Sequence, residues 1–480
     1  MLGLKEKTIK GVSWSIIDNL ANAGITFLIG IILARILSPA EFGLIGMITI
    51  FIAVSNSIVD SGFSSALIRK AKPKDIDFNT VFYFNLCLGI GLYLILFFFA
   101  PTISRFFKEP ILISILRVMG VILIINAFGI VQRSLLVKEV DFKTQTKISL
   151  IASIISGFVG ISMALNGFGV WSLVGQQISR QLLNSIFLWL FNTWRPALEF
   201  SKESFHELFG FGLKLLIADI INTIYNNIYF LIIGKFYSAA QLGQYTRADQ
   251  FNSIFSSNLA NVVQRVSYPV LCSIQDDDER LKSTYQSVIK TTMLVVFASM
   301  LSLAAVAKPL ILILIGEKWL PAVVYLQIIC FAGMLLPLNA INLNMLMVKG
   351  RSDLLLRLEF IKKTIAVIPI CLGIFYGIEF MLWGSVFLSF ASYLLNSYYS
   401  ARLINYSTWT QIKDIFPSFL VSIFVATAMW SLILLNFSIW ITLPLQCILG
   451  LIITIAIYET IKSTEYFELK RILFSVIKRK

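Results

Sequence analysis

Residues that bind metals or form disulfides are scarce in this chain of 480 residues. It has a single histidine, His206, in a polar connector, and five cysteines that lie in or beside apolar stretches. No two of the cysteines form a C-x-x-C pair, the spacing expected of a metal or redox motif. They are Cys87, Cys272, Cys330, Cys371 and Cys447. We therefore expect neither a bound metal nor another cofactor, and we interpret the cysteines as packing residues.

Charged residues are also few, at 14% of the chain, whereas hydrophobic residues make up 57% and the mean hydropathy is +0.82. A soluble protein of this length needs more polar surface to cover its core. Apolar runs of roughly 20 residues recur along the sequence, and a helix of that length crosses about 30 Å of hydrocarbon. The sequence therefore predicts an all-α polytopic membrane protein. No small-residue cleavage site follows the basic start MLGLKEKTIKG, so we expect the first span to act as the insertion signal.

Hydropathy and helix breakers divide the chain into about fourteen predicted spans. One of the breaks is placed at the short sequence LNGFG, between the fifth span and the sixth. The predicted spans lie near 12–34, 42–66, 79–100, 111–133, 148–166, 168–191, 210–234, 241–268, 286–307, 323–347, 358–376, 380–401, 416–436 and 440–460.

Lysine and arginine are distributed unevenly over the connectors. Most of the 40 fall in alternate connectors, beginning with the N-terminal segment, and few fall in the others. Because cytoplasmic connectors carry an excess of Lys and Arg, both termini are predicted to be cytoplasmic. The net charge of +14 is then a topology signal that suits anionic membrane lipids, and it does not imply nucleic acid as a partner.

The connectors are short, which limits what chemistry they can hold. The longest on the predicted outer side, around PTISRFFKEP and LIGEKWLP, have about ten residues, too few for a catalytic domain outside the membrane. No G-x-x-x-x-G-K-[ST] sequence is present, so we do not expect ATP hydrolysis by this chain. The sequence thus favours a protein that is not an enzyme.

A hairpin-like stretch recurs after 200 residues. ILARILSPAEFG at 32–43 corresponds to IIGKFYSAAQLG at 232–243, and six predicted spans separate the two copies. Both copies then start from the same side, as in transporters with two similar parallel halves, although chance similarity of apolar segments is an alternative. The aligned pairs are Asn22 and Asn222, Arg35 and Lys235, Ser38 and Ser238, Ala40 and Ala240, Gly43 and Gly243, Phe51 and Phe251, and Ser57 and Ser257.

The repeat predicts two six-helix lobes related by a pseudo-twofold axis, followed by two further helices. The N-terminal lobe would comprise residues 1–200, the C-terminal lobe 201–401, and the last two spans with a cytoplasmic tail 402–480. Each repeated hairpin would lie at the outer rim and act as a structural hinge.

Polar residues form stripes along several predicted spans. In the sixth span Gln177, Arg180, Gln181 and Asn184 follow the spacing i, i+3, i+4, i+7 and so share one helical face. The eighth span has a similar stripe, which includes Asn261. Polar groups inside a membrane usually face a bundle interior or a watery cavity. We expect a polar cavity between two lobes, with hydrogen-bonded helix packing as the alternative.

Several charged residues within the predicted spans are candidates for a site. Arg180 is nearest to the middle of the membrane, where it must pair with an acid or face water, and a guanidinium grips phosphate well. A structural ion pair is equally compatible with the sequence, and snorkelling is the alternative for cations near span ends. The cations are Arg117, Arg180, Lys214, Arg247 and Arg265. The candidate ion-coupling acids are Asp18, Asp60 and Asp219.

The opening GVSWSIIDNLANAGITFLIGIILARILSPAEFGLIGM, followed by DSGFSSALIRK, resembles the polysaccharide transporter family. These are flippases of lipid-linked oligosaccharides in the multidrug/oligosaccharidyl-lipid/polysaccharide exporter (MOP) superfamily, and the colanic-acid and teichuronic-acid exporters are the most similar branch. The resemblance covers the whole chain through the fourteen spans and the six-plus-six repeat, but its specific part is the first seventy residues.

The resemblance implies a bacterial inner-membrane protein that moves undecaprenyl-pyrophosphate-linked repeat units to the outer leaflet by alternating access around a cationic cavity. It implies membrane lipids and the polysaccharide polymerase machinery as partners and a monomeric chain. Peptidoglycan-precursor flippases of the superfamily carry an arginine early in the first span, where this chain has Asp18. That departure disfavours lipid II as the substrate.

Two rival functions make different demands on the sequence. A cation-coupled multidrug exporter of the same superfamily would use an acid in the first span, as Asp18 could provide, but it would need a net-acidic cavity, which the cations within spans oppose. A glycan polymerase or acyltransferase would need long outer loops or a histidine within the membrane, and this sequence has neither.

Overall fold

The computed structural model describes residues 2–60 and 62–477, except for the side chains of residues 2–13, 15, 16, 211, 214 and 472–477. Within this part of the chain all regular secondary structure is helical and no β-strand occurs. A helix satisfies its own backbone hydrogen bonds, which apolar surroundings cannot do, so long apolar runs fold this way. The predicted all-α class is confirmed.

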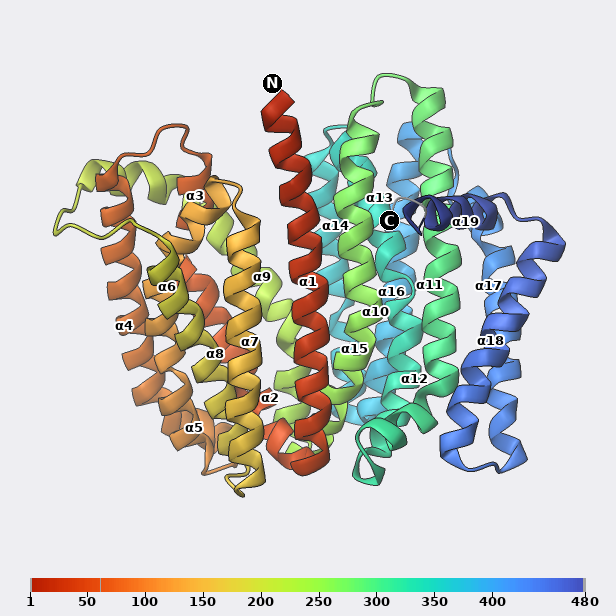
Figure 1. Cartoon of the computed structure of the whole chain (residues 1–480), viewed down its shortest axis with the longest axis horizontal. Coiled ribbons are helices and arrows are strands. Elements are labelled where there is room, and N and C mark those ends of the chain that lie inside the picture. The colour runs from red at the N-terminus through yellow and green to blue at the C-terminus, as the bar shows by residue number, and fades with distance from the viewer. Residues whose placement is uncertain (1, 61, 478–480) are drawn as a thin grey trace. The chain divides into compact units, whose positions relative to one another are not determined.

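The chain divides into two compact units, Met1–Thr246 and Arg247–Lys480, with the division inside α10. In unit 1 the long helices run side by side (Figure 1). Its helices are α1 (Leu2–Ile36), α2 (Pro39–Asp60), α3 (Phe63–Arg69), α4 (Asp75–Phe107), α5 (Leu112–Met119), α6 (Val121–Lys138), α7 (Phe142–Leu165), α8 (Val170–Phe191), α9 (Lys202–Phe236) and the start of α10 (Ala239–Cys272).

Unit 2 contains the rest of α10 and the helices that follow it. Two short 3₁₀ turns, η1 (Glu317–Trp319) and η2 (Leu432–Leu435), lie beside helix ends. The helices are α11 (Asp278–Leu314), α12 (Pro321–Gly333), α13 (Leu336–Val348), α14 (Ser352–Ile365), α15 (Val367–Tyr376), α16 (Ile378–Ile404), α17 (Thr408–Ser431), α18 (Ile439–Ile461) and α19 (Thr464–Ile477).

Among the described residues, 11 helical segments are long and apolar enough to cross a membrane. The three remaining predicted spans, near 168–191, 241–268 and 358–376, correspond to α8, to α10 and to α14 with α15. Polar side chains lower the hydropathy of α8 and α10, and a break at Ala366 leaves α14 and α15 each too short.

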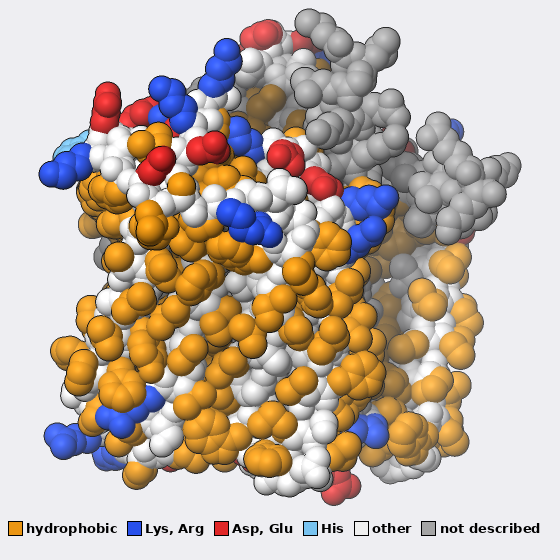
Figure 2. Space-filling model, turned by 60° about the vertical axis from the view of Figure 1, so that its left-hand side comes forward, with side chains coloured by type: hydrophobic (Ala, Val, Ile, Leu, Met, Phe, Trp, Pro, Cys, Tyr) orange, Lys and Arg blue, Asp and Glu red, His pale blue; other side chains and the backbone are white. Residues whose placement is uncertain are grey.

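The surface supports a membrane protein. On the face that Figure 2 shows, hydrophobic side chains cover a broad band, and charged side chains gather at its two edges. Phe98, Phe158 and Leu190 are each at least 70% exposed, although they lie within long apolar helices. Side chains of this kind are stable at the surface where lipid surrounds them.

The break predicted at LNGFG lies between α7 and α8, which end at Leu165 and begin at Val170. Gly167 and Gly169 have φ angles of 79° and 55°, a backbone region that glycine adopts without steric cost. A very short turn therefore joins two adjacent helices, and α7 packs against both α1 and α8.

The two repeated hairpins contact each other within unit 1. A Cβ atom on Gly43 would lie 1.7 Å from the carbonyl oxygen of Ala239, and one on Gly243 would lie 1.8 Å from the carbonyl oxygen of Pro39. The contact is reciprocal: residue 43 meets residue 239 as residue 243 meets residue 39. Only glycine allows the two backbones to approach this closely.

The same side-chain contact closes each hairpin. Glu41 Oε2 accepts hydrogen bonds from the backbone N–H of Ser38 at 2.6 Å and from its hydroxyl at 2.9 Å. In the second hairpin Gln241 Oε1 accepts from the same two groups of Ser238, each at 3.2 Å. The similarity of the two sequences thus extends to their hydrogen bonds.

Candidate functional site

A chain of polar side chains, which we call the Asp18 chain, joins α1 to α7. Asp18 Oδ1 accepts hydrogen bonds from Asn22 Nδ2 at 2.7 Å and from Ser149 Oγ at 2.5 Å. Ser153 Oγ donates to Asn22 Oδ1 at 2.9 Å. Asp18 and Asn22 are one turn apart on α1, as are Ser149 and Ser153 on α7, so two polar faces meet. Hydrogen bonds from Asn22 and Ser149 therefore take the place of water at the half-buried Asp18 carboxylate.

Arg180 extends from α8 toward the same face of α1. Its Nη1 donates to Thr26 Oγ1 over a long 3.4 Å, and Thr26 lies two turns beyond Asp18 on α1. Arg180 forms no ion pair with any carboxylate that the structure describes, although Asp18 is near enough to act on it electrostatically. A half-buried guanidinium held by one weak neutral hydrogen bond keeps most of its donors available for an anion.

The neighbouring residue, Gln181, belongs to a second set of polar residues, the Asn126 chain. Gln181 Nε2 donates to Asn126 Oδ1 at 2.7 Å, and Asn126 Nδ2 donates to Asn56 Oδ1 at 2.9 Å. This chain crosses from α8 through α6 to α2. Next to Asn56, Ser57 forms a 3.0 Å hydrogen bond with Thr223 of α9. Arg180 and Gln181 are adjacent on α8, yet Arg180 contacts α1 whereas Gln181 connects to α6 and α2.

Two of the other predicted cations lie beside aromatic rings. Arg117 donates from Nε to the carbonyl oxygen of Phe97 at 3.4 Å and lies 4.3 Å above the Phe97 ring. Arg247, 6% exposed, donates to Gln250 and lies 5.9 Å from the ring centroid of Trp319 in unit 2. The side chain of Lys214 is outside the described residues. An aromatic face thus accompanies both Arg117 and Arg247.

The two remaining predicted acids are exposed. Asp60, at the end of α2, accepts a hydrogen bond from Ser64 of α3. Asp219 lies on α9 and forms no ion pair with a side chain that the structure describes. Neither acid joins the Asp18 chain.

The rest of the predicted polar residues fall in two places. Gln177 is exposed and Asn184 half-buried on α8, one turn on either side of the pair Arg180 and Gln181. Asn261 is exposed on α10. One turn later in the same stripe, Gln264 Nε2 donates to Asn344 Oδ1 at 3.3 Å, so part of this stripe packs α10 against α13.

The structure adds residues that the sequence interpretation passed over. Thr26, Ser149 and Asn126 contact the predicted site residues Arg180, Asp18 and Gln181, and Ser153 and Asn56 extend the two polar chains. Ser149 and Ser153 do show the i, i+4 spacing of a polar face, which could have identified them. The residues one turn away from Asn126 on its own helix are Ile, Leu or Gly, so its role depends on which helices pack together.

At one end of unit 1, Lys70 links the connector after α3 to two helices. Its ammonium donates to Glu207 Oε2 of α9 at 2.8 Å and to Asp77 Oδ1 of α4 at 3.1 Å. The hydrogen bond to Glu207 raises the pKa of Lys70 above its usual value of 10.5, with a further contribution from Asp77. No cluster of three His, Cys, Asp or Glu residues that could hold a metal occurs among the described residues.

Comparison with known proteins points to one family. A family model described as "Polysaccharide biosynthesis protein" matches residues 32–324. The chain is 26% identical to the lipopolysaccharide biosynthesis protein WzxC of Escherichia coli (strain K12), an alignment that covers 78% of this chain and 76% of that protein. It is 25% identical to the teichuronic acid biosynthesis protein TuaB of Bacillus subtilis (strain 168), with 88% of each chain covered.

Two solved structures have a similar fold. The lipid II flippase MurJ, in an inward closed conformation, matches with a TM-score of 0.74 at 15% identity, over 94% of this chain and all of that one. An inward-facing multidrug resistance MATE family transporter of the MOP superfamily matches with a TM-score of 0.62 at 16% identity, over 82% of this chain and 96% of that one.

These structural likenesses show the fold alone, whereas the family model covers more than half of the chain. The resemblance predicted from the first seventy residues is confirmed. The chain belongs to the family of polysaccharide biosynthesis proteins.

Proposed function

We propose that this protein is a flippase that moves undecaprenyl-pyrophosphate-linked oligosaccharide repeat units from the cytoplasmic to the outer leaflet of a bacterial inner membrane. The units would supply a surface polysaccharide such as a lipopolysaccharide or an exopolysaccharide. The relatives support this, since WzxC and TuaB are named for polysaccharide biosynthesis and ExoT of Rhizobium meliloti (strain 1021), 28% identical over 65% of this chain and 64% of its own, for succinoglycan biosynthesis transport.

The observation that carries the proposal is the environment of Arg180. A guanidinium halfway along an apolar helix is costly unless it has a partner, and the only described partner of Arg180 is a threonine hydroxyl at 3.4 Å. A pyrophosphate would supply the missing acceptors in a geometry that guanidinium matches. Gln177, Gln181 and Asn184 on the same helix, with Asn261 on α10, would bind sugar hydroxyls. Arg117, Lys214 and Arg247 would contribute positive potential.

Alternating access would require two lobes that move as bodies. We propose fourteen spans, with lobes at residues 1–200 and 201–401 and an appendage at 402–480. The reciprocal contact of Gly43 with Ala239 and of Gly243 with Pro39 supports a parallel repeat, because twofold symmetry makes contacts occur in such pairs. A ligand would shift the equilibrium between conformations only through contacts that differ between them.

The charges within spans favour an anionic cargo over an organic cation. Arg180 meets no ion-pairing carboxylate among the described side chains, whereas a cavity for cationic drugs would need a surplus of acid. We propose that Asp18, or alternatively Asp219 or Asp60, couples transport to a proton or Na⁺. The polyprenyl tail would stay in membrane lipid, and the chain would work as a monomer, alone or beside a polysaccharide polymerase.

Substitution of Arg180 tests the proposal in a strain that depends on this chain for its surface polysaccharide. We expect Arg180→Ala to abolish surface polysaccharide and to cause the lipid-linked repeat unit to accumulate on the cytoplasmic side, with a normal amount of protein in the membrane. Arg180→Lys should restore part of the export, because it keeps the charge and loses the fork of donors.

Arg402→Ala is the matched control, since Arg402 is an exposed guanidinium at the end of α16 that contacts Tyr398. Normal surface polysaccharide in Arg180→Ala would overturn the role of Arg180. Drug resistance conferred on a sensitive strain, together with unchanged polysaccharide on deletion of the gene, would overturn the flippase and favour a multidrug exporter.

A further inference from the structure

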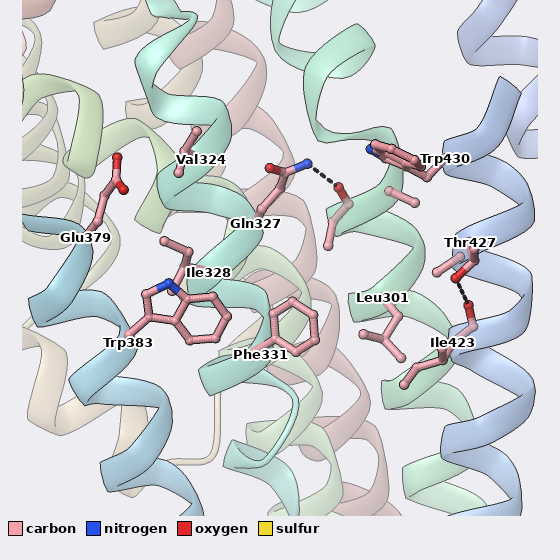
Figure 3. Close-up of a pocket in the computed structure, with 13 residues that line it drawn as sticks. Leu301, Val324, Gln327, Ile328, Phe331, Glu379, Trp383, Ile423, Thr427 and Trp430 are labelled. Atoms are coloured by element: carbon pink, nitrogen blue, oxygen red, sulfur yellow. Dashed lines mark hydrogen bonds between the residues drawn. The ribbon is translucent and has the colours of Figure 1, made fainter. Parts of the chain in front are cut away.

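A groove of about 510 Å³ lies in unit 2 among α11, α12, α16 and α17 (Figure 3). Its walls are mainly apolar, with Leu301 on α11, Ile328 and Phe331 on α12, and Ile423 on α17. The volume falls within the range of roughly 300–1,000 Å³ that is usual for small-molecule sites. None of the cations or acids assigned to transport lines it.

The groove lies near one end of these helices. Glu379 and Trp383 are in the first turns of α16, and Trp430 is in the last turn of α17. Both tryptophans are about half exposed, at 52% and 46%. Tryptophan is enriched where hydrocarbon meets the lipid headgroups. With these tryptophans at the membrane interface, the apolar walls would face the acyl region and Glu379 would lie at the depth of the headgroups.

Glu379 is the one charged side chain in the lining. It is exposed and forms no ion pair or hydrogen bond with any residue that the structure describes. The nearby amide of Gln327 is already engaged, donating to the carbonyl oxygen of Ala304 at 3.3 Å, as Figure 3 shows. The helix dipole favours a carboxylate in the first turn of a helix, which explains why an acid occurs at position 379. The dipole does not explain why an apolar groove lies beside this carboxylate.

We propose that this groove binds a membrane phospholipid whose headgroup carries an amine, with one acyl chain along the apolar walls and the ammonium at Glu379. The Glu379 carboxylate, which has no cationic partner among the described residues, complements an ammonium. The apolar wall beside it complements an acyl chain joined to that ammonium. Phosphatidylethanolamine is the lipid of this chemistry that we would use to test the site.

The charge of the lining separates this ligand from the transported lipid. A pyrophosphate placed at the headgroup depth would be repelled by Glu379, and no lysine or arginine among the described lining residues would compensate. Phosphatidylglycerol, with a net negative headgroup, should be disfavoured for the same reason. The groove thus discriminates by charge against the class of lipid that Arg180 attracts.

Native mass spectrometry of the full chain tests the site. The protein is incubated in mild detergent with equal amounts of phosphatidylethanolamine and phosphatidylglycerol that have the same acyl chains, and the retained lipids are counted. We expect the wild type to prefer phosphatidylethanolamine. Glu379→Gln should lower that preference roughly two- to fivefold, the range expected for one exposed ion pair. Glu317→Gln, an exposed acid in η1 that does not line the groove, should leave it unchanged.

A second substitution tests the walls. Thr427 is exposed in the lining and bonds only to Ile423 of its own helix, so Thr427→Phe should fill the groove and lower retention of both lipids without loss of folding. Thr460→Phe, at an exposed threonine with the same kind of bond on α18, is the control.

The proposal would be overturned if the wild type preferred phosphatidylglycerol. It would also be overturned if neither Glu379→Gln nor Thr427→Phe lowered the retention of phosphatidylethanolamine. A third contrary result would be displacement of phosphatidylethanolamine by an equal amount of polyprenyl phosphate. The last would assign the groove to the transported lipid. The test does not depend on glycan export, and Arg180→Ala should keep the wild-type lipid preference.

Discussion

At the scale of single residues, the polar stripes serve two purposes. Asp18, Asn22 and Ser149 form hydrogen bonds with one another between α1 and α7, as in ordinary hydrogen-bonded packing of membrane helices. Arg180 does not fit that description, because its one described hydrogen bond is long and neutral. The spacing of residues in α8 predicted Arg180 as a candidate, but Thr26 could not be predicted, since it depends on how α1 and α8 approach each other.

Substitutions at Asp18 separate its structural contribution from ion coupling. Asp18→Ala removes the acceptor of two hydrogen bonds, and we expect the free energy of unfolding to fall by roughly 1–3 kcal/mol. Asp18→Asn keeps an acceptor oxygen and should retain most of that stability, yet it should lose glycan export if the carboxylate carries the coupling ion. Thermal unfolding in detergent and surface polysaccharide measure the two effects. An Asp18→Asn variant with full export would exclude Asp18 from coupling.

The Lys70 link to Glu207 predicts a dependence of stability on pH. Because the folded-state pKa of Lys70 is raised, its stabilising effect is complete below the ordinary value of 10.5 and is lost as the pH rises through the higher folded-state value. We expect the melting temperature of wild type to exceed that of Lys70→Met at neutral pH, and the difference to shrink above pH 10.5. A difference that stays constant over that range would contradict this assignment.

At the scale of elements, the repeated hairpins are joined by direct backbone contact. The sequence comparison paired Gly43 with Gly243, and a hinge at the outer rim was expected of each copy. The sequence offered no indication that the two copies would touch, because contact between segments 200 residues apart depends on the arrangement of α1, α2, α9 and α10. The positions of the two glycines follow from that contact.

Alanine at either hairpin glycine tests the contact. A Cβ at position 43 or 243 would overlap a carbonyl oxygen of the other hairpin, so we expect each substitution to destabilise the protein by about 1–3 kcal/mol. The double variant should cost less than the sum, since either change alone separates the hairpins. Gly24→Ala is the control, because a Cβ there meets nothing within 4 Å. Additive effects in the thermal unfolding of the purified variants would argue against a shared contact.

At the scale of the whole molecule, the membrane class and the helical fold follow from hydropathy alone. Of the fourteen predicted spans, those with continuous apolar sequence coincide with the 11 segments that have the length and hydropathy of a span. The other three were also predicted from hydropathy and breakers, although polar faces on α8 and α10 and a break between α14 and α15 weaken the signal. The groove of unit 2 could not be predicted, since it forms where α11 and α12 approach α16 and α17, which lie farther along the sequence.

The distribution of lysine and arginine predicts the orientation of the chain. A fluorescent reporter fused after Lys480 should fold and fluoresce, and alkaline phosphatase at the same position should be inactive, because both termini are expected in the cytoplasm. Fusions that end near Lys318 should give the opposite pair of results. Active phosphatase after Lys480 would mean an odd number of spans or an inverted chain.

The weak hydropathy of α8 has a consequence for how the protein is made. An arginine near the centre of an isolated span disfavours insertion by roughly 2.5–3.5 kcal/mol, so α8 is a poor candidate to leave the translocon on its own. Only residues 166–169 separate it from the apolar α7. We expect the two helices to enter the bilayer together as a hairpin, with Arg180 shielded by helices already inserted. The residue that we propose to bind the cargo would then dictate the order in which the chain is assembled.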